Sequence, residues 1–587
     1  MANHLEQTWV AYAFDDPVPA DDLDARCGRV RRHTQQLFAE EVAEQRATGP
    51  VLGQALWRRP DPRLRASLFA ANAELSVAST SPITGSQRLT GAANDDIESI
   101  GASVLRDPDG ATRLNPPFVI GVVSADRGTL VVANDVIGTA RLFEMEIAGG
   151  RIWSNRIGAL VAFAGERPGI DERAWQVLAA TGWFLGETTS LERVRQLRSG
   201  TVIRAQRTST RTTVRVDRNL DQLETLVKPR RARLQASARD AADAARGLVS
   251  DVGASWDCRI RVDLSGGRDS RVSAAAAISA GLNAELRTSD LEHGEVGLVR
   301  ELIRKAPGDP DHAIKQPERE PEDSLAERLH GIHLVHDGMR NPQSLLRSSM
   351  PIPHGPLESP VLSGHGGELG HGFYYGSPAE IRRLRRGGDD ALMDRLEKAA
   401  RKKHGAARDE AYLAYRDEAE LTLSEGRGLG LKGPALLDYY YLAQRLANRS
   451  GLTTRNERWS ACSTPGFIRA CFDLKPKDRL VSRMHRLVVA ELLPAWADAP
   501  WFEPAADAPD TKRTRIWDKP GHREELGRII EHDESWHGLF DAAEVKAAWT
   551  DALAGDVHQH WEIVFTRVIW RATFERHVEV LDRAASA

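Results

Sequence analysis

The sequence predicts a mixed α/β protein of two parts, an antiparallel sheet followed by a doubly wound parallel sheet that ends in a helical region. Three observations lead to this prediction. Short strand-like segments fill residues 117–154, a strand, glycine loop, helix and strand follow Cys258, and helical periodicity dominates beyond Ser377. Strands that alternate with helices imply a parallel sheet, with sites at the carboxyl ends of its strands.

Composition narrows the class of protein. The chain has 587 residues, a net charge of −4, 41% hydrophobic and 28% charged residues, which is typical of a globular protein with one or more full cores. The near-neutral charge argues against a dedicated nucleic-acid binder. No apolar run is long enough to span a bilayer, no secretory signal is visible, and the four cysteines are scattered without C-x-x-C spacing. We therefore expect a cytoplasmic protein that binds neither nucleic acid nor membrane.

The elements follow in order along the chain. The segments FVIGVV, TLVVAND, RLFEMEIA and RIWS between residues 117 and 154 read as antiparallel strands separated by turn residues. A helix is expected around residues 170–182 and a closing hairpin over 200–216. Residues 217–250 contain KPRRAR and an alanine-rich helical stretch, the composition of a linker helix. The predicted domains are therefore 1–216 and 251–587, joined by this linker.

The most informative motif is the loop Ser265-Gly266-Gly267-Arg268-Asp269-Ser270, which follows an apolar strand. Its glycines let backbone N–H groups close on phosphate oxygens at the start of the next helix. It is neither a Walker A loop nor a dinucleotide G-x-G-x-x-G motif. In a phosphate-binding role, Ser265 and Ser270 would donate hydrogen bonds and Asp269 would ligate Mg²⁺. A glycine turn with a Ser/Asp helix cap is the alternative.

A second glycine-rich loop, Ser363-Gly364-His365-Gly366-Gly367-Glu368, follows another strand-like segment, so both loops are expected at one edge of the sheet. Here the sequence resembles the asparagine synthetase family, whose synthetase domain carries S-G-G-x-D-S and later S-G-E-G-A-D-E. The resemblance covers roughly residues 255–515, including PGFI at 465–468 and DLKPKD at 473–478, and is weaker over 117–205.

The resemblance implies an ATP-pyrophosphatase (PP-loop) domain with ATP and Mg²⁺ as cofactors. The residues that it assigns to the nucleotide and pyrophosphate are Leu264, Ser265, Gly266, Gly267, Asp269, Ser270, Thr288, Ser363 and Gly364. Glu368 falls where the family has the Asp of G-A-D-E, so it would complete the metal site with Asp269. Asp290 would lie next to the adenine pocket. Asp337 is expected either to face the substrate or to cap a turn.

His365 departs from the family, which has Glu there in asparagine synthetases and Tyr in the related β-lactam synthetases. A neutral imidazole at this place can remove a proton from an incoming amine, or it can simply fill a polar loop position. Lys512 lies roughly where the family has a catalytic lysine that stabilises developing charge, with Arg513 and Lys519 as alternatives. The predicted catalytic residues are His365 and Lys512.

The first domain resembles the glutaminase half of glutamine-dependent asparagine synthetases, an antiparallel β-sandwich with flanking helices. Asn134-Asp135-Val136-Ile137-Gly138 stands in place of A-R-D-x-x-G. That half attacks glutamine with an N-terminal cysteine whose own α-amine acts as base. Residue 2 here is Ala, and Cys27 has no free α-amine beside it. Glutamine hydrolysis is therefore expected to be absent, a loss or reuse shared by β-lactam synthetases and lasso-peptide cyclases.

These features together predict an ATP-dependent ligase that adenylates a carboxylate, releases pyrophosphate and captures the acyl-adenylate with an amine. A lasso-type peptide macrocyclase or another natural-product amide synthetase is the favoured form. Its expected partners are a precursor peptide and leader-processing proteins. The oligomeric state is left open, with a homodimer as one alternative. Ammonia-dependent asparagine synthesis is one alternative. A catalytically retired binding scaffold is the alternative from another class, against which the two intact loops argue.

Overall fold

Three sheets organise the chain. The structure is a computed structural model that describes residues 7–38, 42–91, 96–230, 233–290, 294–315, 325–339, 359–404, 406–449, 458–503, 515, 517–555 and 560–586. Two sheets are antiparallel and six-stranded, and the third is parallel and five-stranded. The fold class predicted from the sequence is confirmed.

The two antiparallel sheets pack face to face as a sandwich. The first has the strand order β10-β8-β9-β1-β3-β2 and the second β12-β11-β7-β6-β5-β4. Alternate residues of both sheets meet between them, including Trp9, Leu56 and Trp153 from the first and Val132 and Ile203 from the second. The strands are β1 (Gln7–Phe14), β2 (Ala43–Thr48), β3 (Leu52–Arg58), β4 (Phe69–Ala71), β5 (Leu75–Ser79), β6 (Val119–Ser124), β7 (Thr129–Asn134), β8 (Phe143–Ile147), β9 (Gly150–Ser154), β10 (Val194–Gln196), β11 (Thr201–Arg207) and β12 (Thr212–Arg218).

Helices cover both outer faces of the sandwich. Tyr12 and Phe14 of β1 pack on one side against α1 (Ala20–Phe38) and α4 (Ile157–Ala164), where Tyr12 stacks on Phe163. On the other side, α3 (Ile97–Arg106) packs against Val77 of β5. The helix expected around residues 170–182 is α5 (Glu172–Thr181). The short helical elements of this region are α2 (Gln87–Thr90) and η1 (Asp109–Arg113).

The parallel sheet has the order β15-β14-β13-β16-β17. Its strands are β13 (Ile260–Asp263), β14 (Ala284–Ser289), β15 (His312–Lys315), β16 (Val361–Ser363) and β17 (Arg458–Ser460). Its crossover helices are α8 (Asp269–Ser279), α9 (Glu295–Lys305) and α10 (Leu325–His336). The segment expected as a linker forms α6 (Leu220–Val227) and α7 (Leu234–Ser255), and α7 packs against α8 and the C-terminal helices α16 and α18. The position of the domain boundary stays a prediction.

The C-terminal part is mainly helical, as expected. Its elements are η3 (Gly367–His371), α11 (Pro378–Arg386), α12 (Gly388–His404), α13 (Asp409–Gly428), α14 (Pro434–Tyr440), the π-helix η4 (Tyr441–Leu446), α15 (Ala447–Arg449), η6 (Ala461–Ser463), α16 (Pro465–Phe472), α17 (Pro476–Leu480), α18 (Arg483–Leu492), η7 (Pro494–Trp496), α19 (Pro520–His532), α20 (Ala542–Ala554) and α21 (His560–Ser586). None of the described helices has the length and apolarity that a bilayer-spanning segment requires.

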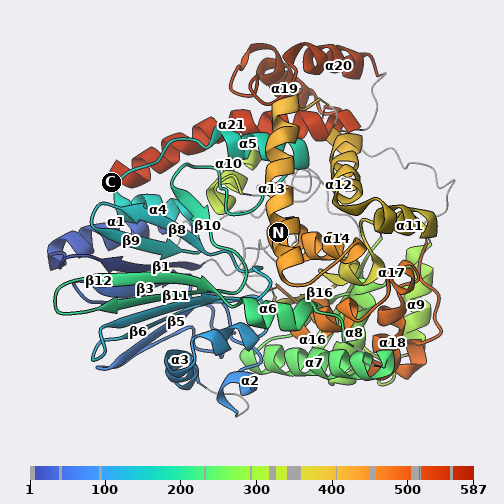
Figure 1. Cartoon of the computed structure of the whole chain (residues 1–587), viewed down its shortest axis with the longest axis horizontal. Helices are drawn as coiled ribbons and strands as arrows, with labels where there is room; N and C mark the ends of the chain where they lie inside the picture. Colours follow the sequence, from blue (N-terminus) through green and yellow to red (C-terminus); the bar gives the residue numbers. More distant parts are fainter. Residues whose placement is uncertain are drawn as a thin grey trace.

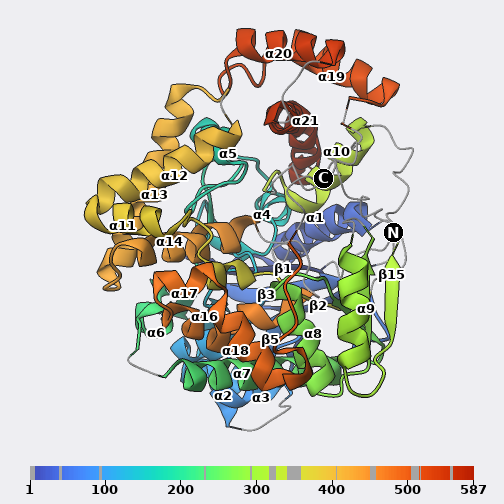
Figure 2. The ribbon, with the colours of Figure 1, turned by 90° about the vertical axis from the view of Figure 1, so that its right-hand side faces the viewer.

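The long helix α21 contacts both the helices that cover the sandwich and those of the C-terminal part. It runs across the top of Figure 1 from the α19–α20 end to the helices above the sandwich, and it contacts α1, α4, α10 and α12. Figure 2 shows α19 and α20 at the opposite end of the molecule from α7, with β15 and α9 at one edge. The parallel sheet therefore lies between α7 and the upper helical layer, beside the sandwich.

Candidate functional site

The two glycine-rich loops meet at the switch point of the parallel sheet. From β13 the chain passes to β14 and β15 on one side and then to β16 and β17 on the other, so the order reverses between β13 and β16. These two strands are direct neighbours, with Val262 opposite Leu362. A Cβ atom on Gly364 would collide with the backbone of Asp269 and Ser270. The expectation that both loops share one sheet edge is confirmed, at the place where α/β sheets bind ligands.

Hydrogen bonds preorganise the first loop. The Ser265 N–H donates to Ser270 Oγ at 3.0 Å, the two serine hydroxyls lie 2.8 Å apart, and the Gly267 N–H donates to Ser265 Oγ at 3.1 Å. The Gly266 N–H donates to Glu295 Oε1 at 3.0 Å. A carboxylate oxygen of the chain itself thus occupies one loop amide, and the role of this amide in phosphate binding stays a prediction.

Neighbouring segments brace this loop from both sides. The Thr288 hydroxyl, which is buried, donates to the carbonyl of Leu264 at 2.9 Å and lies 2.8 Å from His312 Nε2. The Phe502 N–H and the Arg271 guanidinium both donate to the carbonyl of Gly266, at 2.8 and 2.7 Å. Thr288 therefore supports the loop through Leu264, while Asp290 is exposed at the end of β14.

Asp269 lies between two histidines. Its Oδ1 is 2.8 Å from His371 Nε2 and 2.9 Å from His485 Nε2. Burial alone would raise the pKa of Asp269, but the two imidazoles outweigh burial and hold this pKa below its usual range. Burial lowers the pKa of His485. Asp269 is therefore an anion beside a neutral His485 at neutral pH.

Glu368 lies apart from this group. The atoms of Asp269, His371 and His485 that can ligate a metal all lie within 4.8 Å of one another, and Glu368 is not a member of the group. Its Oε2 accepts a hydrogen bond of 2.7 Å from Tyr441 in η4. Burial, followed by the charge of Glu368, raises the pKa of Tyr441 well above its ordinary value, so the phenol stays protonated and donates. A joint metal site of Asp269 and Glu368 stays a prediction.

His365 contacts the end of β16. Its Nδ1 is 2.9 Å from Ser363 Oγ and 3.5 Å from Arg458 Nη1. The Ser363 hydroxyl also donates to the carbonyl of Trp459 at 3.4 Å. When the Ser363 hydroxyl donates its hydrogen bond to the Trp459 carbonyl, its oxygen is free to accept from His365. The imidazole then carries its proton on Nδ1 and donates it to Ser363 Oγ, and Nε2 keeps its lone pair.

Other predicted residues fall elsewhere. Lys512 and Arg513 lie outside the described residues, as does residue 2, while Lys519 precedes α19. Cys27 is buried in α1, and burial followed by the Glu44 charge raises the pKa of its thiol to about 11. A thiol with a raised pKa is a poor nucleophile, which agrees with the expectation that Cys27 does not serve as one.

Asp337 belongs to a second, buried cluster. Its Oδ2 accepts from the Ile157 N–H at the start of α4 at 3.0 Å, and its Oδ1 is 3.2 Å from His577 Nε2. Burial alone would raise the pKa of Asp337, but His577, His33 and Arg156 hold it below its usual range. This geometry supports the capping interpretation of Asp337, although the element it caps is a helix far away in the sequence.

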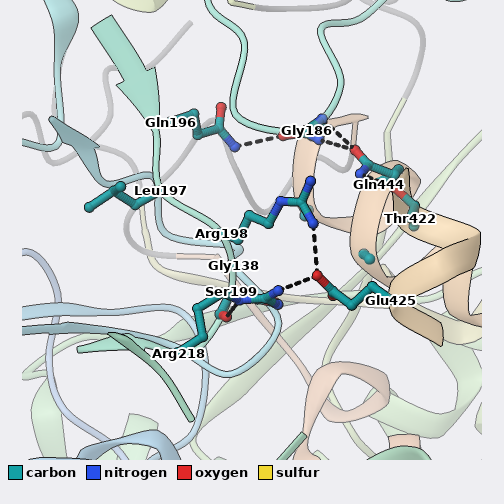
Figure 3. Close-up of a pocket in the computed structure, with 13 residues that line it drawn as sticks. Gly138, Gly186, Gln196, Leu197, Arg198, Ser199, Arg218, Thr422, Glu425 and Gln444 are labelled. Carbon is teal, nitrogen blue, oxygen red and sulfur yellow. Dashed lines mark hydrogen bonds and ion pairs between the residues drawn. The ribbon is translucent and has the colours of Figure 1, made fainter. Parts of the chain in front are cut away.

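A polar junction between the sandwich and the helices is shown in Figure 3. Arg198 and Arg218 converge on one carboxylate oxygen of Glu425, and Gln444 accepts a hydrogen bond from the Gly186 N–H at 2.9 Å. The cavity among these residues has a volume of about 20 Å³, room for roughly one water molecule. This pocket is too small for a substrate, so its residues act as a structural contact.

Sequence reasoning did not single out His371 or His485. His371 is the last residue of η3, just beyond the second loop. Its closeness to that loop in the sequence could have marked it as a candidate site residue. His485 lies in α18, and nothing in its surrounding sequence marks it. Their meeting at Asp269 depends on the packing of α18 against α8 and η3.

Comparison with known proteins adds little. No protein-family model and no curated protein matches the chain. Among solved structures it is similar to the glutamine phosphoribosylpyrophosphate amidotransferase from B. subtilis complexed with ADP and GMP, with 11% identity, a TM-score of 0.23, and coverage of 48% of this chain and 65% of that one. It is also similar to a structure described as the allosteric regulatory enzyme of purine biosynthesis, with 11% identity, a TM-score of 0.24, and coverage of 54% and 82%.

The chain thus spans just under two thirds of the first of these proteins. At such TM-scores the likeness carries no argument about fold or function. The fold stands on the sheets and helices described above, and the asparagine synthetase resemblance stays a prediction from the sequence motifs.

Proposed function

We propose that this protein is an ATP-dependent amide-forming ligase. A carboxylate oxygen of one substrate attacks the α-phosphorus of ATP, and pyrophosphate leaves. An amine then attacks the carbonyl carbon of the acyl-adenylate, AMP leaves, and the amine loses a proton. The observation that supports this proposal most is the contact of the S-G-G-R-D-S loop with the second glycine loop at the switch point of the parallel sheet.

The residues present fit a nucleotide bound with Mg²⁺. Mg²⁺ is usually held by one or two carboxylates together with phosphate oxygens. Asp269 offers such a carboxylate beside the loop amides, and Glu368 offers a second on the neighbouring loop. When bound, Mg²⁺ would neutralise charge on the pyrophosphate. The chain would contribute the loop N–H groups and the hydroxyls of Ser265 and Ser270, which would exchange their present hydrogen bonds within the loop and to Glu295 for phosphate oxygens.

His365 is proposed as the base for the second half of the reaction. In the tautomer that donates from Nδ1 to Ser363 Oγ, its Nε2 can accept the proton that the amine loses. The finer form of the proposal is a peptide macrocyclase or another natural-product amide synthetase. It rests on His365 standing where the family has an acidic residue, which gives the second loop a neutral base for an incoming amine.

Pyrophosphate exchange into ATP tests the first step. Purified protein is given Mg²⁺, ATP, labelled pyrophosphate and a panel of aspartate, glutamate and short peptides that carry these side chains. Exchange with one of them is expected, and Asp269→Asn should reduce it by at least about 10²-fold. Asp311→Asn, which removes an exposed carboxylate paired with Arg259, is the matched control. Formation of ADP and phosphate would contradict adenylation, and an absence of any ATP binding would favour the retired scaffold.

A further inference from the structure

A cluster of three potential metal ligands stands beside the first loop, in a combination that Mg²⁺ does not favour. Asp269 Oδ1, His371 Nε2 and His485 Nε2 come from three separate elements, α8, η3 and α18. Imidazole nitrogens suit transition-metal ions such as Zn²⁺, Fe²⁺ and Ni²⁺, whereas Mg²⁺ prefers oxygen ligands. Metal bonds of about 2.0–2.2 Å place adjacent ligand atoms about 2.8–3.1 Å apart in octahedral and about 3.3–3.6 Å apart in tetrahedral coordination. The distances of 2.8 and 2.9 Å from Asp269 Oδ1 to the two Nε2 atoms match the octahedral spacing and lie about 0.5 Å below the tetrahedral one.

The burial of His485 is a second, independent reason to expect a metal ion at this cluster. Its side chain is completely buried, and within the described part of the chain neither of its ring nitrogens makes a hydrogen bond of acceptable geometry. Its Nε2 nevertheless lies 2.9 Å from Asp269 Oδ1. A buried imidazole without a hydrogen-bond partner is costly. A metal ion shared by the two side chains would satisfy this nitrogen without requiring the direction of a hydrogen bond.

The backbone of η3 is shaped around these side chains. A Cβ atom on Gly367 would collide with the carboxylate of Asp269, and one on Gly370 would collide with the ring of His485. Arg479, which is buried, holds this turn by donating to the carbonyl of Leu369 and lies 3.3 Å from Asp438. Two glycines and a buried arginine thus keep the turn that carries His371 close to both other ligands.

We propose that Asp269, His371 and His485 bind one divalent transition-metal ion such as Zn²⁺, which would take the place of Mg²⁺ at the Asp269 carboxylate. The side chains of Asp269 and His371 are 23% and 22% exposed, while His485 closes the inner side. The site is therefore open on one side, as are metal sites that also take a ligand from solution. That the exposed side receives pyrophosphate oxygens rests on the proposed function, but binding of the ion itself does not.

Metal titration without nucleotide tests the proposal. The full-length protein is freed of metal with a chelator, and Zn²⁺ binding is followed by calorimetry, with Co²⁺ absorption as a second readout of nitrogen ligands. One equivalent should bind with a dissociation constant of about 1 μM or below, and millimolar Mg²⁺ should not displace it. His371→Gln should weaken binding by at least about 100-fold. His312→Gln, a histidine near the same sheet edge but outside the cluster, should leave it unchanged.

Because His485 is buried, His485→Gln is interpreted only where its circular dichroism and melting temperature match the wild type; the partly exposed His371 carries the test otherwise. No binding by the wild-type protein, equal binding by His371→Gln, or equal loss in His312→Gln would overturn the proposal. These outcomes differ from a failure of the proposed function, because a protein that binds Zn²⁺ but shows no pyrophosphate exchange retains the metal site and loses only the ligase assignment.

Discussion

Asp269 and Asp337 are each placed next to histidines, yet their surroundings differ. Asp337 is buried, accepts a backbone N–H from the start of α4 and lies near Arg156 and His577. Asp269 is 23% exposed, starts α8 at the switch point of the parallel sheet and faces His371 and His485. The first carboxylate joins α4 to α10 and α21, and the second stands at a ligand-binding edge.

The comparison shows that residue types alone do not separate a structural cluster from a reactive one. Around Asp337, the Ile157 N–H and His577 Nε2 each face one carboxylate oxygen and the side chain is buried, so it has little capacity left for a ligand. Around Asp269, Gly364 and Gly367 have no side chains, so the second loop can pack closely against this residue. One side of the Asp269 carboxylate remains exposed. Changes at the switch point should therefore alter chemistry, and changes around Asp337 should alter stability.

The largest effect on the amine step alone is expected at His365. His365→Ala should lower amide formation by about 10²- to 10⁴-fold, because a general base is lost. Pyrophosphate exchange should stay near the wild-type rate, because adenylation removes no proton from the amine. Both rates are measured on the same preparation with the carboxylate found in the exchange panel and its amine. If Nδ1 instead accepts a hydrogen bond from the Arg458 guanidinium, the ring proton lies on Nε2, and His365→Ala will form product at the wild-type rate.

Truncation of the two aspartates gives the most direct contrast. Asp337→Ala leaves the buried Ile157 N–H and His577 Nε2 without the carboxylate that they face and should cost about 3 kcal/mol of unfolding free energy. Asp269→Ala should cost only about 1 kcal/mol while it abolishes exchange. Urea unfolding followed by tryptophan fluorescence measures both variants. Equal losses of stability would show that the two clusters are alike.

Mild acid should affect the Asp337 cluster through His33. Burial lowers the pKa of His33 to about 4, although Asp337 opposes this and His577 and Arg156 add to it. Because an unfolded histidine has a pKa of about 6.5, the unfolded state binds more protons between about pH 6.5 and 4. The free energy of unfolding should therefore fall on acidification, by at most about 1.4 kcal/mol per pH unit from this residue. Urea unfolding at several pH values should give a smaller slope for His33→Gln, and an unchanged slope would exclude His33 as the source.

Much of the fold could be predicted because its strands carry local patterns. The segments that became β6, β7, β8, β9, β11 and β12 alternate or are bounded by turn residues, and the first glycine loop follows its strand directly. The three-residue β17 lies within the helical region and has no measurable periodicity. It is a strand only because it pairs with β16, from Val361 opposite Arg458 to Ser363 opposite Ser460.

The candidate site could be predicted only where its residues are contiguous. The loop amides and Asp269 belong to one motif, and His365 lies inside the second. His485 reaches Asp269 because α18 packs against α8, a contact that no local sequence pattern contains. The contact of Glu368 with Tyr441 is of the same kind, because η4 brings the phenol to this carboxylate from outside the motif.

The smallest effect is expected at Glu295, whose Oε1 accepts the Gly266 N–H at 3.0 Å. A bound polyphosphate would bring several negative charges to the same loop, so the glutamate carboxylate opposes it. Glu295→Gln removes this charge and keeps an acceptor of the same shape, and it should tighten binding of a non-hydrolysable ATP analogue by about 3- to 10-fold at low ionic strength. Calorimetry measures the affinity. Glu301→Gln on the same helix, where Glu301 pairs with Lys305 at 2.8 Å, is the matched control. Weaker binding by Glu295→Gln would contradict this expectation and would mean that the carboxylate helps to hold the nucleotide. The first loop would then bind phosphate while the Gly266 N–H still donates to Glu295.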